Sequence, residues 1–219
     1  MSDTARKAIL DRLRQARHGL PRPAAPGLPG DQPAPPADFT TFAAALARLA
    51  VPFDLAADPA EARTILGAVL ARHNVKTAVL WEDHPDLAAV DAAAFLEASG
   101  VRLRDAAGPD ERPCPVLADV DLGLTGVDQA LCATGTLVLA ARPEQPRAVP
   151  LVPRLHVALV ARSRLLADLP ALLAARHGQP MPSALTCVSG ISSTGDIEFM
   201  YVRGVHGPLA VHVIGLDWR

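Results

Sequence analysis

The sequence predicts an α/β domain with a mostly parallel sheet, helices on both faces of that sheet, and an N-terminal helical arm. From Phe39 onward, segments with helical periodicity alternate with short apolar runs rich in β-branched residues. These runs are apolar on both faces, which is typical of parallel strands covered on both sides. The chain has 219 residues, of which 50% are hydrophobic. That is enough to bury one sizeable core.

The N-terminal part divides into a helix and a linker. Ile9, Leu10, Leu13 and Ala16 recur at helical spacing beneath a basic face, so residues 1–18 are expected to form an amphipathic helix. Residues 19–38 are rich in proline, which removes backbone donors and disfavours helix at the preceding residue. We therefore expect a Pro-rich linker over 19–38 and an α/β domain over 39–219.

Helices are expected wherever apolar residues recur every three or four positions. One contains Phe39, Phe42 and Leu46; a second begins at Asp58-Pro59-Ala60-Glu61, which combines an N-cap, a proline at N1 and a capping-box acid. A third ends at Gly100, and helical turns between 163 and 176 are expected to be interrupted at Pro170.

Strands are expected in the apolar runs between these helices. The runs are 77–81, 101–103, 120–124, 137–141, 155–160, 184–188 and 211–216. Between 120 and 141 there is little room for a crossover helix, so this stretch is expected to contain an antiparallel hairpin.

Charge and composition exclude several classes of protein. A formal net charge of -2 does not fit the broad positive surface that nucleic acids require. No segment approaches the roughly 20 apolar residues of a membrane span, and no signal peptide is evident, so a cytoplasmic location is expected. Cys114, Cys132 and Cys187 are odd in number and lack CxxC spacing, which argues against a disulfide framework or a metal site in this chain.

The first cluster with chemical potential is GLTGVDQALCATGTLVL, residues 123–139. Thr125, Thr134 and Thr136 offer hydroxyl groups, Gly135 relaxes the backbone, and Asp128 is a lone acid among apolar residues. A tight turn accounts for every residue except Asp128, which would then cap a helix or pair with an arginine. A turn and a ligand loop both remain open.

The second cluster is SGISSTGDIE, residues 189–198. Ser192, Ser193, Thr194 and Gly195 precede a run that could begin a helix, whose exposed amides would suit a phosphate or carboxylate. Asp196 and Glu198 could instead cap an ordinary helix. If Glu198 faces a cleft, it becomes a candidate general base, nucleophile or ribose-binding group.

The third cluster is RGVHGP, residues 203–208. Glycine and proline constrain the bend around His206, and Arg203 can form bidentate bonds to a carboxylate or phosphate. His206 is a candidate acid, base or donor, although a structural turn explains it equally well. His212 lies six residues away within an expected strand, so a metal pair is disfavoured.

These clusters, in this order, resemble the lactate utilization protein C family, also called the LUD domain. The matching stretches are residues 123–139, LVPRLHVALV at 151–160, and SGISSTGDIEFMYVRGVHGPLAVHVIGL at 189–216. ARKAILDRLRQA, residues 5–16, is similar to the opening helix of the family. The resemblance implies a fold like that of sugar-phosphate isomerases and CoA transferases (NagB/RpiA-like), distantly similar to 5-formyltetrahydrofolate cyclo-ligases.

The resemblance also implies a function. The family belongs to a three-component system that oxidises L-lactate to pyruvate, so iron-sulfur clusters are expected in partner subunits and none in this chain alone. An anionic small molecule is expected at the three clusters. The alternatives are a stand-alone small-molecule-binding enzyme or sensor, and a structural scaffold in which the clusters are ordinary turns.

Overall fold

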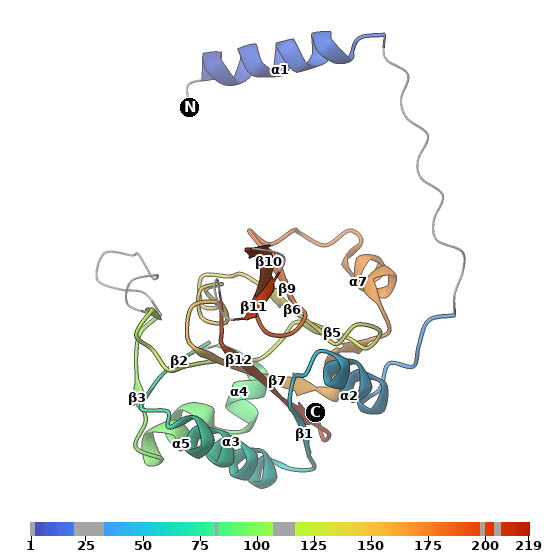
Figure 1. Ribbon diagram of the computed structural model, residues 1–219. Helices are drawn as coiled ribbons and strands as arrows, with labels where there is room; N and C mark the ends of the chain where they lie inside the picture. Colours follow the sequence, from blue (N-terminus) through green and yellow to red (C-terminus); the bar gives the residue numbers. More distant parts are fainter. Residues whose placement is uncertain (1–2, 20–32, 82, 107–116, 198–199, 204–206) are drawn as a thin grey trace. The chain divides into compact units, whose positions relative to one another are not determined.

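The computed structural model describes residues 3–19, 33–81, 83–106, 117–197, 200–203 and 207–219 (Figure 1). The chain divides into two compact units, Met1–Pro33 and Ala34–Arg219. Helix α1 (Asp3–Arg17) belongs to the first unit, and its apolar residues Ile9, Leu10 and Leu13 are all exposed. No helix in the part of the chain that the structure describes is long and apolar enough to cross a bilayer.

The second unit is built on a sheet of six parallel strands. Their order is β1-β12-β7-β4-β2-β3. The strands are β1 (Phe53–Ala56), β12 (Ala210–Leu216), β7 (Leu155–Ala161), β4 (Leu122–Thr125), β2 (Thr77–Leu80) and β3 (Arg102–Leu103). Every residue of β7 and β4 is buried, as expected for strands with both faces covered. The predicted fold class, α/β with a mostly parallel sheet, is confirmed.

Three helices cover one face of this sheet: α3 (Pro59–His73), α4 (Pro85–Ala89) and α5 (Ala92–Ala98). The start of α3 is a capping box, as the sequence predicts. Asp58 accepts from the amide of Glu61 at 2.9 Å, and the Glu61 carboxylate accepts from the amide of Ala57 at 2.8 Å. Leu66 and Leu96 are fully buried against strand residues such as Val157.

The other face is covered by helix α2 (Phe39–Arg48) and by a second sheet of order β8-β5-β6-β9 (Figure 1). The strands of this sheet are β8 (Leu165–Leu166), β5 (Gln129–Leu131), β6 (Thr136–Ala140) and β9 (Leu185–Val188). Helix α7 (Leu169–Arg176) packs on it through Leu172, which contacts Leu131 and Val138. Among the described residues, helix α2 and a sheet therefore cover this face, where the sequence suggested helices alone.

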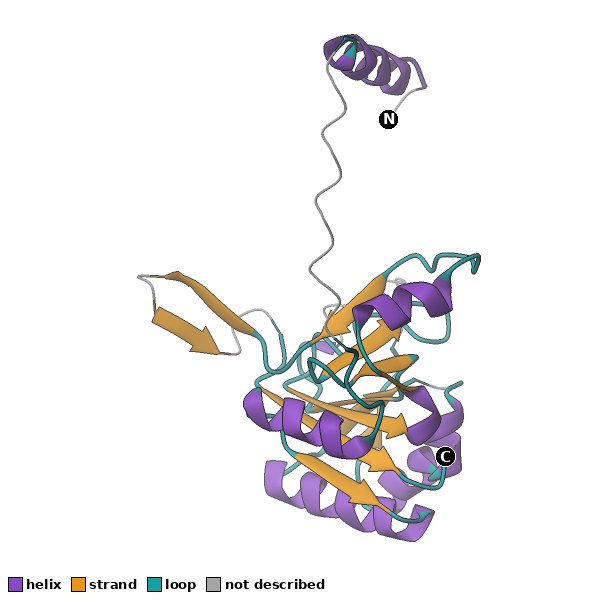
Figure 2. Ribbon diagram, turned by 90° about the vertical axis from the view of Figure 1, so that its right-hand side faces the viewer, coloured by secondary structure: helices purple, strands orange, loops and turns teal. Residues whose placement is uncertain are grey.

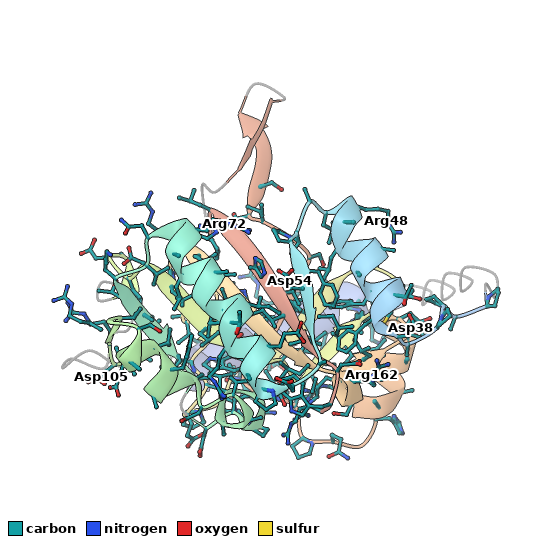
Figure 3. The ribbon with its side chains drawn as sticks, turned by 90° about the horizontal axis from the view of Figure 1, so that it is seen from below. Asp38, Arg48, Asp54, Arg72, Asp105 and Arg162 are labelled. Carbon is teal, nitrogen blue, oxygen red and sulfur yellow. The ribbon has the colours of Figure 1, made fainter. Side chains whose placement is uncertain are left out.

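Helix α2 shows how local sequence fixes an element on that face. Its N-cap, Asp38, accepts from the amide of Thr41 at 2.7 Å, and Arg48 lies in the last turn, near the helix's negative end. Figure 3 shows these two residues at opposite ends of the helix. Arg162 approaches the same helix, with its guanidinium 5.3 Å from the ring centroid of Phe39.

Three local predictions differ from the structure. An antiparallel hairpin does form between 120 and 141, but it joins β5 to β6, while residues 122–125 form a parallel strand of the first sheet. Pro170 lies in the first turn of α7 and does not interrupt a helix, because Asp168 caps that helix through the amide of Ala171 at 2.9 Å. The third difference concerns residues 193–197, which are extended.

Candidate functional site

The carboxyl ends of the parallel strands form the natural place for a ligand. After β2 the chain moves outward to β3, and it then returns to form β4 on the other side of β2. Ligands of open α/β sheets bind at such a switch point, beyond the carboxyl ends of the strands. The residues that follow β2, β4 and β7 at this edge include His84, Asp128 and Arg164.

Asp128 is held firmly at this edge. Its amide donates to the Val138 carbonyl at 2.9 Å, and its Oδ2 accepts from the amide of Ala140 at 2.7 Å. Its Oδ1 accepts from Nη2 of Arg142 at 2.5 Å and lies 4.0 Å from Nη2 of Arg176. The side chain is 11% exposed. Its carboxylate is therefore a fixed negative charge beside two guanidinium groups.

Arg142 and Arg176 approach Asp128, Arg164 lines the same hollow, and each of the three comes from a different element. Arg142 follows β6, and its Nη1 also donates to Oε1 of Gln145 at 2.5 Å. Arg176 is the last residue of α7, and its side chain is 20% exposed. Arg164 follows β7 in a short 3-10 helix. We call Asp128, Arg142, Arg164 and Arg176 the arginine site.

Two of these arginines lack full partners. The buried Nε of Arg176 has no hydrogen-bond acceptor among the described residues. Arg164 forms no ion pair or side-chain hydrogen bond within the described part of the chain. Buried donors without an acceptor are uncommon in folded proteins, and water or a ligand usually satisfies them. The guanidinium fork suits a carboxylate or a phosphate.

The arginine site lines a hollow of about 390 Å³. Its other lining residues are Gln129, Leu172, Ala175, Gln179 and Pro180. A second hollow of about 590 Å³ shares Arg142, Arg176 and Pro180 with the first, and is also lined by Pro143, Met181 and Pro182. Positive charge is thus placed between two spaces that a small molecule can enter.

His84 supports the site from within the core. It is 4% exposed, and its Nδ1 accepts from the amide of Asp86 at 3.2 Å. Desolvation lowers the pKa of His84, an effect that the nearby Asp86 carboxylate partly opposes. The ring occupies the space beside Gly126, where an added Cβ would lie 2.0 Å from Cε1 and Nδ1. Glycine at this position therefore allows the chain to pass over His84 toward Asp128.

The structure separates the residues that the first sequence cluster grouped together. Thr125 is buried in the core, where its hydroxyl bonds Nε2 of His156 at 2.9 Å. Thr134 and Thr136 lie at the turn of the β5-β6 hairpin, whereas Asp128 precedes β5 at the other end. That separation is about 10 Å, at the usual rise of a strand.

A chain of hydroxyl groups forms at the turn of this hairpin. Thr134 Oγ1 lies 2.7 Å from Thr136 Oγ1, which lies 2.7 Å from Ser189 Oγ on the segment after β9. Gly135 adopts a φ of +66°, which favours glycine. The turn and the beginning of the second sequence cluster are therefore neighbours.

The rest of the second cluster forms β10 (Ser193–Ile197), which pairs in a hairpin with β11 (Met200–Arg203), with Ser193 opposite Arg203 of the third cluster. Figures 2 and 3 show this hairpin extending beyond the rest of the second unit. The expected helix start is wrong, because Gly195 and its neighbours form a strand and present no helix N-terminus. Ser192 lies at the base of the hairpin, where its Cβ would be 3.0 Å from a Cβ at Gly207.

Several candidate groups fall outside the described residues. They are the side chains of Thr194, Asp196 and Arg203 and the whole of Glu198 and His206. Their roles stay predictions, as does the idea that the segments around Thr134 and Thr194 share one pocket. Sequence reasoning missed Arg142, Arg164, Arg176 and His84, which are isolated in the sequence. For Arg164 and His84 the signal that could have found them is position, since both follow strands of the parallel sheet.

Comparison with known proteins identifies the family. The LUD domain matches residues 40–215 of the chain. The chain belongs to the LUD domain family. All four residues of the arginine site lie within the matched LUD domain.

Curated relatives of this LUD domain are named lactate utilization protein C. One from Halalkalibacterium halodurans is 30% identical over 156 residues, covering 69% of this chain and 67% of that protein. Another from Shouchella clausii is 31% identical over 161 residues, covering 70% and 68%. Among solved structures, a DUF162 family protein from Deinococcus radiodurans matches with a TM-score of 0.55 and 24% identity, covering 81% of this chain and 95% of that one. This last match supports the fold.

Proposed function

We propose that the protein acts in L-lactate utilization together with iron-sulfur partner subunits, and that it binds an anionic small molecule at the arginine site. The names of the curated relatives support the pathway. The expected cytoplasmic location belongs to the same proposal. The observation that carries the ligand is the hollow lined by three arginines and one carboxylate, at the sheet edge where such folds bind ligands.

The chemistry of the cysteines fits a division of labour in which partners carry the clusters. Iron-sulfur clusters are held by thiolates. Cys132 is fully buried, and desolvation raises its pKa to about 11, so it is a protonated thiol at neutral pH. In this proposal the LUD domain supplies a binding site, and the electrons travel through the partners.

Growth of a deletion strain on L-lactate tests the proposal. The strain receives wild-type protein, Arg176→Gln, or the control Arg102→Gln, which changes an exposed arginine on β3. Wild type and the control should restore growth on L-lactate, and Arg176→Gln should restore it poorly while leaving growth on another carbon source unchanged. Full growth of the deletion strain itself on L-lactate would disprove a role in this pathway.

The iron-sulfur partners require a separate measurement. Tagged wild-type protein should co-purify with subunits that carry iron and acid-labile sulfide, in amounts comparable to its own. Purification of the chain alone from lactate-grown cells would contradict the proposed partners and favour the stand-alone enzyme or sensor. That alternative has a structural basis, because one chain supplies all four groups of the arginine site.

A further inference from the structure

The arginine site carries more positive charge than its own carboxylate balances. Arg142, Arg164 and Arg176 contribute three positive charges and Asp128 contributes one negative charge, which leaves an excess of two. No other acidic side chain is among the described residues that line this hollow. A monocarboxylate such as L-lactate would neutralise half of that excess, whereas a dianion would neutralise all of it.

The donors of the site divide into held and free groups. Arg142 is fixed between Asp128 and Gln145, each at 2.5 Å, so its orientation is set before a ligand arrives. The guanidinium of Arg164 has no acceptor within the described chain, and the Nε of Arg176 is buried without one. Two arginines with unpaired groups among the described residues therefore line a single hollow together with a third, fixed arginine.

A single group with several acceptor oxygens matches this arrangement. A phosphate monoester at neutral pH carries most of its two negative charges on one group with three strong acceptor oxygens. A dicarboxylate places its two charges on separate groups, so one of them would lie away from the three arginines. Both charges of a phosphate can be shared among guanidinium groups in the same hollow.

The space also exceeds the needs of L-lactate. Lactate has six non-hydrogen atoms, which fill at most about 180 Å³ if each takes the ~30 Å³ of a liquid water molecule. The hollow of about 390 Å³ is more than twice that size. The second hollow of about 590 Å³ continues past Arg142 and Arg176 and is lined by apolar groups that include Pro143, Met181 and Pro182.

We propose that the arginine site binds a phosphate monoester, with its phosphate between Arg164 and Arg176 and its organic body against Met181 in the second hollow. This inference rests on the proposed function, since it names the class of anion for the same site. L-lactate is then not the molecule held there. The protein would sense or use a phosphorylated metabolite while its partners oxidise lactate.

Thermal unfolding and calorimetric titration of the full chain test this at constant ionic strength. The probes are phenyl phosphate, inorganic phosphate, succinate and L-lactate. Phenyl phosphate should raise the melting temperature in proportion to the logarithm of its concentration and bind at least about 10-fold more tightly than succinate or L-lactate. Equal binding of L-lactate or succinate would overturn the phosphate assignment.

Variants locate the site. Arg164→Gln and Arg176→Gln should each weaken phenyl phosphate binding by about 10-fold to 100-fold, as expected for loss of one charged hydrogen-bonding group. Arg164→Gln removes no ion pair or side-chain hydrogen bond within the described chain, so it should fold as the wild type does. Met181→Ala should weaken phenyl phosphate and leave inorganic phosphate unchanged. The control Arg102→Gln should change neither, and unchanged binding in both arginine variants would exclude this site.

The result separates the two proposals. If L-lactate binds as tightly as phenyl phosphate and Arg176→Gln weakens both, the anion site of the proposed function stands and the phosphate inference fails. If none of the four probes binds, the phosphate inference fails again, and the growth experiment decides the pathway by itself.

Discussion

Replacing Gly126 with alanine tests the close packing beneath the arginine site. The added Cβ would lie 2.0 Å from both Cε1 and Nδ1 of His84 and 2.6 Å from its Cγ. Carbon atoms pack favourably at about 3.5–4.0 Å, so the ring or the chain must move by roughly 1.5 Å. The ring has little room, since His84 is 4% exposed and its ring centroid lies 5.9 Å from that of Trp81.

The expected cost follows from this overlap. Overpacking of a core typically costs about 1–3 kcal/mol, and movement of His84 would also break its bond to the amide of Asp86. We therefore expect Gly126→Ala to lower the free energy of unfolding by about 2–3 kcal/mol. For a domain of this size the melting temperature should fall by about 4–12 °C.

A double-mutant cycle identifies the cause. Urea unfolding, followed by tryptophan fluorescence, gives the free energy for wild type, Gly126→Ala, His84→Ala and the double variant. Once the ring is gone, Gly126→Ala should cost less than about 0.5 kcal/mol, which gives a coupling of about 2 kcal/mol. The same cost in both backgrounds would refute the argument.

Gly67→Ala is the matched control for this cycle. Its Cβ would meet only Cζ of Phe95, at 3.5 Å, which is an ordinary contact. Because Gly67 lies within helix α3, alanine should stabilise the protein by about 0.5–1 kcal/mol. Gly67→Ala should therefore raise the free energy of unfolding, whereas Gly126→Ala should lower it.

Three further predictions concern buried polar groups. Burial lowers the pKa of His156 from 6.5 to about 4, so the unfolded chain binds more protons between these values and stability falls as pH drops from 6.5 toward 4. His156→Gln should flatten that decline in urea unfolding, leaving the part due to His84 and His212, whose pKa values burial also lowers. Asp128→Asn should cost about 1–3 kcal/mol in thermal unfolding by removing the partner of Arg142, and should tighten phenyl phosphate binding severalfold. Trp81→Phe should cost about 1–3 kcal/mol in urea unfolding, because the indole no longer donates to the Pro146 carbonyl.

The sequence predicted those parts of the fold that local chemistry determines. The capping box at Asp58 and the largely apolar run that becomes β7 each predict one element. The short strands β1, β5 and β8 were not predicted, because two to four residues carry too little periodicity to distinguish a strand from a turn. Their pairing depends on contacts with distant strands, which a local pattern does not contain.

The same limit applies to the site. The hydroxyl-rich loops were predicted as candidate sites because several polar groups are adjacent in the sequence. Two of these loops are joined in the structure by the hydrogen bond between Thr136 and Ser189. The arginine site has no such local density, since Arg142, Arg164 and Arg176 come from three elements separated by 12 or more residues. These three arginines become neighbours only when the second sheet and α7 pack against the parallel sheet.

The geometry around Asp128 supports an anchoring role, and its role as a catalytic acid or base stays a prediction. Oδ2 is occupied by the Ala140 amide and Oδ1 by Arg142, and the side chain is 11% exposed. A general base needs an oxygen within hydrogen-bonding reach of its substrate. Because both oxygens accept hydrogen bonds, we interpret Asp128 as the anchor that holds Arg142 in place, and its charge reduces the repulsion between Arg142 and Arg176. Asp128→Asn tests the anchor, since loss of an anchor should lower the melting temperature and tighten phenyl phosphate binding severalfold, whereas an unchanged melting temperature would contradict it.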